Sequence, residues 1–416
     1  MSRIIVKNNG SLSGEVEISG SKNGAIPILA ACVLSKGTNI LKGIPNLSDI
    51  KIMLEILYSL GAEIEINKDE VRINCDKIKK YTTPYELVNK MRGSFLLAGA
   101  LLSRHSHAKI SMPGGCPIGT RPVDLHLKGF AQMGAEIEQS HGYIELSASR
   151  LHGEKIYLDF PSVGATENII MAATLADGET IIENAAAEPE IVDLSEFLIK
   201  CGAKISGAGS DTIKIIGVGE LFATEHKIIP DRIEAGTFMA ALAITRGRGR
   251  VKNICLEHVR PMLAKLREMG AEIAEEESAV VIDAYHELVS TDIKTMPFPG
   301  FPTDMQAQFG GLLSTAKGTG LIVETVFENR FLHMSELKRM GANIKIEGRT
   351  SVIEGVNELT GTKVNAADLR GGAALVLAGL RAKGITEISG IEHIERGYDS
   401  FVDKLAALGA EIYKEK

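Results

Sequence analysis

One thiol lies in the part of this chain that most suggests chemistry. Cys116 belongs to the glycine- and proline-rich segment 113–122, five residues before Arg121. Glycine and proline keep a segment out of regular structure, and a guanidinium close to a thiol favours the reactive thiolate. Cys116 is therefore a candidate acid, base or nucleophile for a charged substrate. The alternative, a buried and inert thiol, suits Cys32 and Cys201, which lie in apolar stretches.

The elements that must position this thiol follow a sixfold repeat. The phrase Gly-Ala-x-Ile recurs at intervals of 73, 68, 68, 71 and 68 residues, each time after Leu, Met or Cys. This pattern is typical of a helix that ends in a left-handed glycine before the chain enters a strand. The six glycines are Gly61, Gly134, Gly202, Gly270, Gly341 and Gly409.

Upstream of each phrase lies a short segment that is apolar nearly all round, namely 26–34, 95–102, 169–175, 238–244, 309–313 and 373–380. A buried helix and a buried strand both fit such a run, and its alanine and glycine content favours a helix buried on all sides. Each repeat therefore predicts strand, loop, buried helix, strand, amphipathic helix and strand. Three repeats form one α/β domain with helices inside and sheets outside, and six form two. The rival is a solenoid, although distinct polar capping repeats are missing.

A polar residue occupies an equivalent position in every repeat, 37 to 42 residues before the glycine of the phrase. The position is where a strand enters the buried helix, so backbone N–H groups and a helix N-terminus suited to anions are expected there. If these ends of two domains face each other, they enclose a cleft. Each residue taken singly also fits a helix cap or a solvated surface group. The six residues are Lys22, Arg92, Ser162, Asp231, Asp304 and Asp368.

Composition excludes several classes of protein. The chain has 416 residues, enough for two domains, and a net charge of −7 without a basic block that would fit nucleic acid. It shows no leader-like apolar region and no membrane-length apolar run, so a soluble, cytoplasmic protein is expected. Five cysteines without metal-ligand spacing indicate reduced thiols and no metal site.

Several motifs together resemble those of the enolpyruvyl transferase family, and most closely its UDP-N-acetylglucosamine 1-carboxyvinyltransferases, the MurA enzymes. The resemblance covers essentially the whole chain. It implies two inside-out α/β barrel-like domains, each of three repeated units with buried helices. Residues 1–20 and 230–416 would form the second domain, and residues 21–229 the first, with the cysteine loop 113–122. The motifs are Ser21–Gly24, 113–126, Pro161–Thr166, Pro302–Gln308, Phe327–Phe331 and Arg396–Tyr398.

The resemblance also implies a reaction. The enolpyruvyl group of phosphoenolpyruvate passes to the 3′-hydroxyl of UDP-N-acetylglucosamine by addition and elimination, with release of phosphate. This is the first committed step of peptidoglycan synthesis, so cell wall biogenesis, cell shape and cell division depend on it. The family needs no cofactor, forms a pyruvate adduct and is the target of fosfomycin. No nucleic acid, membrane or obligate protein partner is implied.

Roles follow by motif match. Cys116 would protonate C3 of the enol, Asp304 would take the hydroxyl proton, and Lys22, Arg121 and Arg396 would surround the phosphate and carboxylate, where fixed charge in a dry site is most effective. Asp368 and Arg370 are carried over as near-site positions only. The positions matched to substrate binding are Lys22, Asn23, Arg92, Arg121, Pro122, Val123, Asp124, Leu125, Ser162, Val163, Gly164, Asp304, Val326, Arg330, Asp368, Arg370 and Arg396.

One position departs from the pattern of the family. Phe160 stands where some members have a basic residue, so only backbone N–H groups are expected to bind anions there.

Three other functions are alternatives. The cysteine loop and the segment 121–125 argue against the related transferase that acts on shikimate 3-phosphate. A catalytically silent nucleotide-sugar sensor conflicts with the joint presence of Lys22, Cys116, Asp304 and Arg396. A protein-binding repeat scaffold would favour exposed apolar faces.

Overall fold

The computed structural model describes residues 2–112 and 123–415, so Cys116, Arg121 and Pro122 lie outside the described residues. The chain divides into two compact units. The N-terminal unit holds residues 20–112 and 123–229, and the C-terminal unit holds residues 2–19 and 230–415. Each unit has a hydrophobic core of its own.

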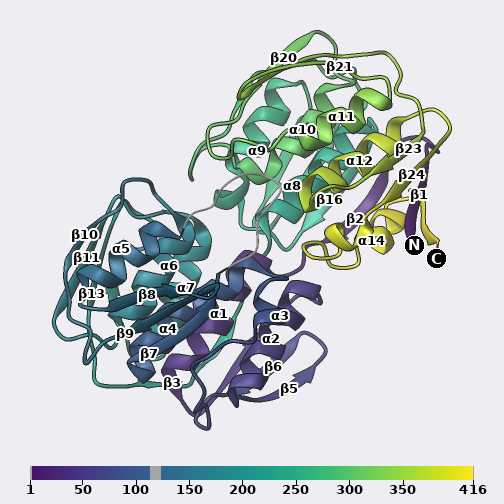
Figure 1. Cartoon of the computed structure of the whole chain (residues 1–416). Helices are drawn as coiled ribbons and strands as arrows, with labels where there is room; N and C mark the ends of the chain where they lie inside the picture. Colours follow the sequence, from purple (N-terminus) through teal and green to yellow (C-terminus); the bar gives the residue numbers. More distant parts are fainter. Residues whose placement is uncertain (1, 113–122, 416) are drawn as a thin grey trace. The chain divides into compact units, whose positions relative to one another are not determined.

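The six apolar segments form helices in the cores of the two units (Figure 1). In the C-terminal unit α8, α10 and α12 contact one another, and in the N-terminal unit α4 contacts both α1 and α6. The prediction of buried helices, rather than buried strands, is confirmed. The central helices are α1 (Lys22–Ala31), α4 (Leu97–His105), α6 (Val163–Ala173), α8 (Arg232–Ile244), α10 (Gln306–Leu313) and α12 (Leu369–Arg381).

Sheets cover the central helices of the N-terminal unit. One has the order β15-β4-β6-β5, with β15 (Glu225–Lys227), β4 (Thr38–Lys42), β6 (Glu70–Asn74) and β5 (Glu63–Asn67). The second is β7 (His107–Ser111), β9 (Tyr143–Ser147) and β8 (Glu136–Ser140). The third is β10 (Lys155–Tyr157), β11 (Glu179–Glu183), β13 (Thr212–Ile216) and β12 (Lys204–Ser206). The short strands β3 (Ser35–Lys36) and β14 (Leu221–Phe222) also pair.

The C-terminal unit repeats this plan and includes the start of the chain. Its sheets have the orders β2-β16-β18-β17, β19-β20-β22-β21 and β23-β24-β1-β25. The strands are β1 (Arg3–Lys7), β2 (Ser13–Glu17), β16 (Arg248–Lys252), β17 (Glu272–Glu276), β18 (Ala279–Asp283), β19 (Ile293–Lys294), β20 (Thr319–Val323), β21 (Asn343–Glu347), β22 (Thr350–Glu354), β23 (Lys363–Asn365), β24 (Ile385–Ser389) and β25 (Glu411–Glu415).

Strand pairing closes each unit on itself, which argues against a solenoid. β15, which follows the third repeat, pairs in parallel with β4 of the first repeat. In the C-terminal unit β2 pairs in parallel with β16, and β1 lies between β24 and β25. The first and last strands of the chain are therefore neighbours (Figure 1).

An amphipathic helix precedes each Gly-Ala phrase, as predicted, and all six glycines of the phrase have φ between +92° and +117°. A left-handed residue ends each helix, and glycine adopts that conformation without strain. These helices are α2 (Ser48–Leu60), α5 (Asp124–Gln132), α7 (Pro189–Lys200), α9 (Leu256–Glu268), α11 (Leu332–Arg339) and α14 (Phe401–Ala407). Two one-turn helices, α3 (Tyr85–Val88) and α13 (Ile391–Ile394), add to the plan.

The strands that follow the amphipathic helix of each repeat differ from the prediction in one respect. Where a single strand was expected after the amphipathic helix, five repeats have an antiparallel hairpin, as in β12 and β13. The second strand of the hairpin pairs with the strand that follows the central helix, so one exit strand alone would leave the sheet incomplete. In the sixth repeat β1 supplies this second strand.

Candidate active site

The six polar positions lie where the repeat predicts, at the entrances of the central helices. Ser162, Asp231 and Asp368 are the N-caps of α6, α8 and α12, and each side chain accepts a hydrogen bond from the first turn of its helix. The helix-cap interpretation is therefore correct for these three side chains. Lys22 is the first residue of α1, and Arg92 begins the 3-10 helix that precedes α4.

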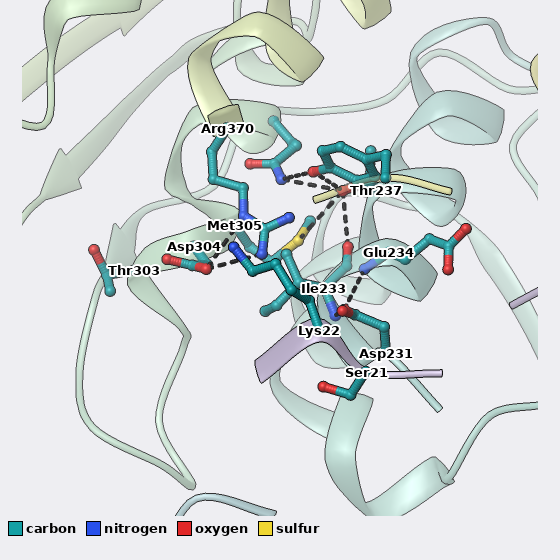
Figure 2. Close-up of polar contacts among 12 residues, drawn as sticks. Ser21, Lys22, Asp231, Ile233, Glu234, Thr237, Thr303, Asp304, Met305 and Arg370 are labelled. Atoms are coloured by element: carbon teal, nitrogen blue, oxygen red, sulfur yellow. Dashed lines mark hydrogen bonds and ion pairs between the residues drawn. The ribbon is translucent and has the colours of Figure 1, made fainter. Parts of the chain in front are cut away.

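Asp304 is held by two guanidinium groups in the C-terminal unit. It lies on a 3-10 turn, Thr303–Met305, directly before α10. Its Oδ1 accepts from Nη2 of Arg330 at 2.7 Å, and its Oδ2 accepts from Nη2 and Nε of Arg370 at 3.0 and 3.2 Å. The two arginine side chains are only 4% and 2% exposed, whereas Asp304 is 26% exposed. The carboxylate is thus fixed in direction and remains partly exposed. Figure 2 shows its contact with Arg370.

A second set of bonds fixes the turn that carries Asp304. Nη1 of Arg330 donates to Oγ1 of Thr303 at 3.1 Å, and this hydroxyl donates to Oε2 of the buried Glu324 at 2.8 Å. Oε1 of Glu324 also accepts from the backbone N–H groups of Val326 and Phe327 at 2.8 and 3.1 Å. Glu324 therefore links the Asp304 turn to the segment of Val326, a predicted substrate position.

Arg370 joins this carboxylate to a buried polar network. Burial opposes the charge of Arg370, but the neighbouring Tyr398 and Asp304 outweigh burial and raise the pKa of its guanidinium. The guanidinium lies 5.2 Å from the ring centre of Tyr398. The Tyr398 hydroxyl is 2.9 Å from Oγ1 of Thr237, and Nε2 of Gln308 donates to both oxygens at 3.0 Å. These bonds hold the Tyr398 ring against Arg370, whose guanidinium stays charged beside Asp304.

Lys22 and the start of α6 belong to the N-terminal unit. Nζ of Lys22 lies 3.6 Å from Oδ2 of the buried Asp49 on α2, an ion pair that directs the ammonium group. Ser162, Val163 and Gly164 form the half-buried start of α6. The N–H of Ser162 donates to the carbonyl of Phe160 at 2.7 Å, so the N–H groups of Val163 and Gly164 are the ones that suit an anion there. Phe160 is 44% exposed two residues earlier.

His126 lies on α5, and its ring packs close to the start of α6. Its Nδ1 accepts from Nδ2 of Asn168 at 2.8 Å, so Nε2 carries the proton of the neutral ring. A Cβ atom placed on Gly164 would lie 3.2 Å from His126 Cε1, which shows how closely the ring approaches this helix start. Burial, assisted by the charge of Arg92, lowers the pKa of His126 to about 3.

This lowered pKa predicts an acid-dependent loss of stability. The unfolded chain binds a proton at His126 below pH 6.5, whereas the folded chain does so only near pH 3, so stability falls as the pH falls through this window. For His126→Gln we expect a lower stability at pH 7 but a pH slope smaller by up to ~1.4 kcal/mol per pH unit between these values. Urea unfolding at a series of pH values measures the pH slope of the stability of both proteins. Equal slopes for the parent protein and His126→Gln would contradict the lowered pKa of His126.

Sequence reasoning missed several of these groups. His126 was part of a recognised motif without a role, and Asn168, Glu324 and Tyr398 were not assigned. Glu324 directly follows β20, and a buried carboxylate at a strand end is a signal that the sequence offers. Asn168 in the apolar run of α6 is a second such signal. The side-chain partners His126 of Asn168 and Thr303 of Glu324, however, lie 42 and 21 residues away and become evident only in the fold.

The remaining predicted positions differ in exposure. Asn23 is half-buried in the first turn of α1, and Arg396 is half-buried after α13. Val123 is the buried N-cap of α5, Asp124 is exposed, and Leu125 is half-buried. Among the described residues, no group of His, Cys, Asp and Glu side chains is arranged to hold a metal ion.

Three described cysteines behave as the inert alternative predicts. Cys32, Cys75 and Cys201 are buried, and burial raises the pKa of Cys75 and Cys201 to about 12. Burial also raises the pKa of Cys32 well above its usual value. These thiols are poor nucleophiles.

Two comparisons identify the class of protein. The family model of EPSP synthase (3-phosphoshikimate 1-carboxyvinyltransferase) matches residues 6–405, so this chain belongs to that family. The enolpyruvyl transferase NikO from Streptomyces tendae has a TM-score of 0.90 at 25% identity over 99% of this chain and 98% of its own. EPSP synthase from Acinetobacter baumannii has the same fold, with a TM-score of 0.77 at 21% identity over both whole chains. The predicted fold class is confirmed.

Curated relatives are more specific than the family model. UDP-N-acetylglucosamine 1-carboxyvinyltransferase 1 of Caldanaerobacter subterraneus subsp. tengcongensis is 57% identical over 413 residues, 99% of each chain. UDP-N-acetylglucosamine 1-carboxyvinyltransferase 2 of Carboxydothermus hydrogenoformans is 55% identical over 414 residues, again 99% of each. The corresponding enzyme 2 of Clostridium tetani is 54% identical over the full length of both. In the part of the chain that the structure describes, no helix is long and apolar enough to cross a membrane.

Proposed function

We propose that this chain transfers the enolpyruvyl group of phosphoenolpyruvate to the 3′-hydroxyl of UDP-N-acetylglucosamine and releases phosphate. The observation that carries the proposal is the identity of 57% over 99% of both chains with an enzyme of that name. It is a transferase of peptidoglycan synthesis. Phosphate release from phosphoenolpyruvate that requires UDP-N-acetylglucosamine tests the proposal.

The reaction needs two proton transfers, and the proposal assigns one group to each. In the addition step the 3′ oxygen bonds to C2 of the enol while a proton is delivered to C3, and the hydroxyl loses its proton. In the elimination step the bond from C2 to the phosphate oxygen breaks and C3 returns a proton, which restores the double bond. Cys116 is the proposed acid at C3, on its sequence context, and Asp304 is the proposed acceptor of the hydroxyl proton.

The contacts of Asp304 suit a carboxylate that accepts the hydroxyl proton only briefly. Two guanidinium groups favour its carboxylate form, so the carboxylate holds and directs the hydroxyl and takes its proton only transiently. The fixed direction of the carboxylate is the main contribution of these two arginines, because a base must lie within hydrogen-bond reach of its proton.

Cations serve the anionic substrates in the same proposal. Lys22, Arg121 and Arg396 would bind the phosphate and carboxylate of phosphoenolpyruvate, where they stabilise charge that develops as phosphate leaves. The UDP-sugar and near-site positions are proposed to be Asn23, Arg92, Arg121, Pro122, Val123, Asp124, Leu125, Ser162, Val163, Gly164, Val326, Arg330, Asp368 and Arg370. Residues 1–20 with 230–416, and residues 21–229, are proposed as the two functional domains.

A cytoplasmic location is part of the proposal, because both substrates carry phosphate groups that do not cross a membrane unaided. No cofactor is required in this reaction scheme, since the acid, the base and the cations are side chains of the chain itself.

A further inference from the structure

Within residues 2–112 and 123–415, the chain passes between its two units at two places. It leaves the C-terminal unit after Ser19, and it returns to that unit at Pro230. Lys22, a proposed phosphate ligand, follows Ser19 by only three residues. Whatever holds Ser19 therefore also limits where the segment that carries Lys22 begins.

All polar groups of Ser19 are held by the C-terminal unit. Its backbone N–H donates to Oε2 of Glu234 at 2.9 Å, and its carbonyl accepts from the N–H of Asp231 at 2.9 Å. Its hydroxyl accepts from Nζ of Lys404 at 2.7 Å. Glu234 and Asp231 both belong to the start of α8, and Figure 2 shows them one turn apart.

Glu234 and Lys404 also form an ion pair with each other, at 2.6 Å between Oε1 and Nζ. Their side chains are 3% and 19% exposed. Burial raises the pKa of Glu234 to about 7, although the charge and hydrogen bond of Lys404 oppose the shift and Asp231 adds to it. A buried ion pair is a poor source of stability, because desolvation offsets the attraction, and its best-attested use is to fix position.

The segment beyond Ser19 has little freedom. A Cβ atom on Gly20 would lie 1.9 Å from the carbonyl oxygen of Gly43, so the backbone packs there without space for a side chain. The N–H of Ser21 donates to the carbonyl of Ile229 at 2.7 Å, and the Ser21 hydroxyl caps α1. Gly20 lies between the bonds of Ser19 and those of Ser21 and is restrained by its packing against Gly43. The path from Ser19 to Lys22 is therefore short and constrained.

We propose that Glu234 and Lys404 are positioning residues for the enolpyruvyl transfer, which hold Ser19 and so restrain the start of the segment that carries Lys22, a proposed ligand of the anionic substrate. The inference rests on the proposed function. Neither side chain contacts a proposed substrate ligand directly in the bonds described, so their effect passes through Ser19. The side chain of Asp231 caps the start of α8, and its backbone N–H donates to the carbonyl of Ser19. Asp231 therefore also helps to hold Ser19.

The test replaces each partner and measures both the segment and the reaction. Glu234→Gln keeps the size of the side chain but removes its charge, and Lys404→Met removes the ammonium group. We expect faster amide hydrogen exchange at Ser19 and a loss of about 10-fold to 100-fold in kcat/KM for phosphoenolpyruvate, because small displacements of a positioning group have effects of this size. Assays are made at a temperature at which unfolding curves show the variants fully folded.

Two further variants separate positioning from general stability. Lys404→Arg keeps the charge and the donors, so it should retain most of the activity that Lys404→Met loses. Glu395→Gln removes an ion pair of the same unit, the half-exposed contact of Glu395 with Lys414 at 2.8 Å, and should leave kcat/KM unchanged. Full activity of folded Glu234→Gln and Lys404→Met would overturn the proposal. Unchanged amide exchange at Ser19 in both variants would show that Glu234 and Lys404 do not hold Ser19. This result does not depend on which acceptor substrate the enzyme uses.

Discussion

Replacing Asp304 by asparagine is expected to lower turnover by about 10²–10⁴-fold, the range over which general acid–base catalysis contributes. Asparagine has nearly the same size and keeps one acceptor oxygen for Arg330 or Arg370, but it cannot take the proton of the hydroxyl. Binding of UDP-N-acetylglucosamine should fall much less, because the remaining ligands of the sugar nucleotide are intact. Steady-state phosphate release and calorimetric titration with the nucleotide sugar measure the two effects.

Asp292 offers a control for this substitution. It is an exposed aspartate of the same unit that accepts a hydrogen bond from the backbone of Leu321 at 2.9 Å. Asp292→Asn should therefore leave turnover at the parental value. Turnover of Asp304→Asn within a few-fold of the parent protein would contradict the assigned role of this carboxylate.

Cys116 is expected to be alkylated selectively by the epoxide fosfomycin, and faster when UDP-N-acetylglucosamine is present. The expectation rests on the glycine-rich sequence around the thiol and on Arg121. The structure adds a reason for selectivity, because Cys32, Cys75 and Cys201 are buried and burial raises the pKa of each thiol. Peptide mapping after the reaction identifies the site, and Cys255 is the half-buried internal control.

Cys116→Asp separates the acid role from the nucleophilic one. The variant should keep at least part of the activity, since a carboxyl group also donates a proton, and it should form no fosfomycin adduct. Complete inactivity of the folded variant would contradict a role as acid alone. An adduct at another cysteine would show that the thiol environment has been assigned wrongly.

The repeat was readable from the sequence because each unit ends in a strongly constrained local structure. The Gly-Ala phrase requires a left-handed glycine, which Gly61 and its five counterparts supply, and the apolar runs require burial on all sides. Counting back from those glycines located Lys22, Asp231 and Asp304 at helix entrances without any knowledge of strand pairing. Local conformational rules therefore carried much of the fold and the placement of the candidate site.

Contacts between distant segments were not predictable in this way. The two arginines that hold Asp304 lie 26 and 66 residues from it, and nothing in their neighbourhoods specifies that partner. The place of β1 between β24 and β25 also depends on pairing across nearly the whole chain. Roles of single residues, as distinct from their positions, came from the family resemblance and are tested by the variants described above.

Acceptor-dependent phosphate release tests the central claim most directly. The purified full-length chain is mixed with phosphoenolpyruvate and either UDP-N-acetylglucosamine or shikimate 3-phosphate, and free phosphate is measured together with the mass of the organic product. We expect phosphate release only with UDP-N-acetylglucosamine, in equal amount to a product that has gained one enolpyruvyl group. Release with shikimate 3-phosphate instead, or no release with either acceptor, would contradict the account.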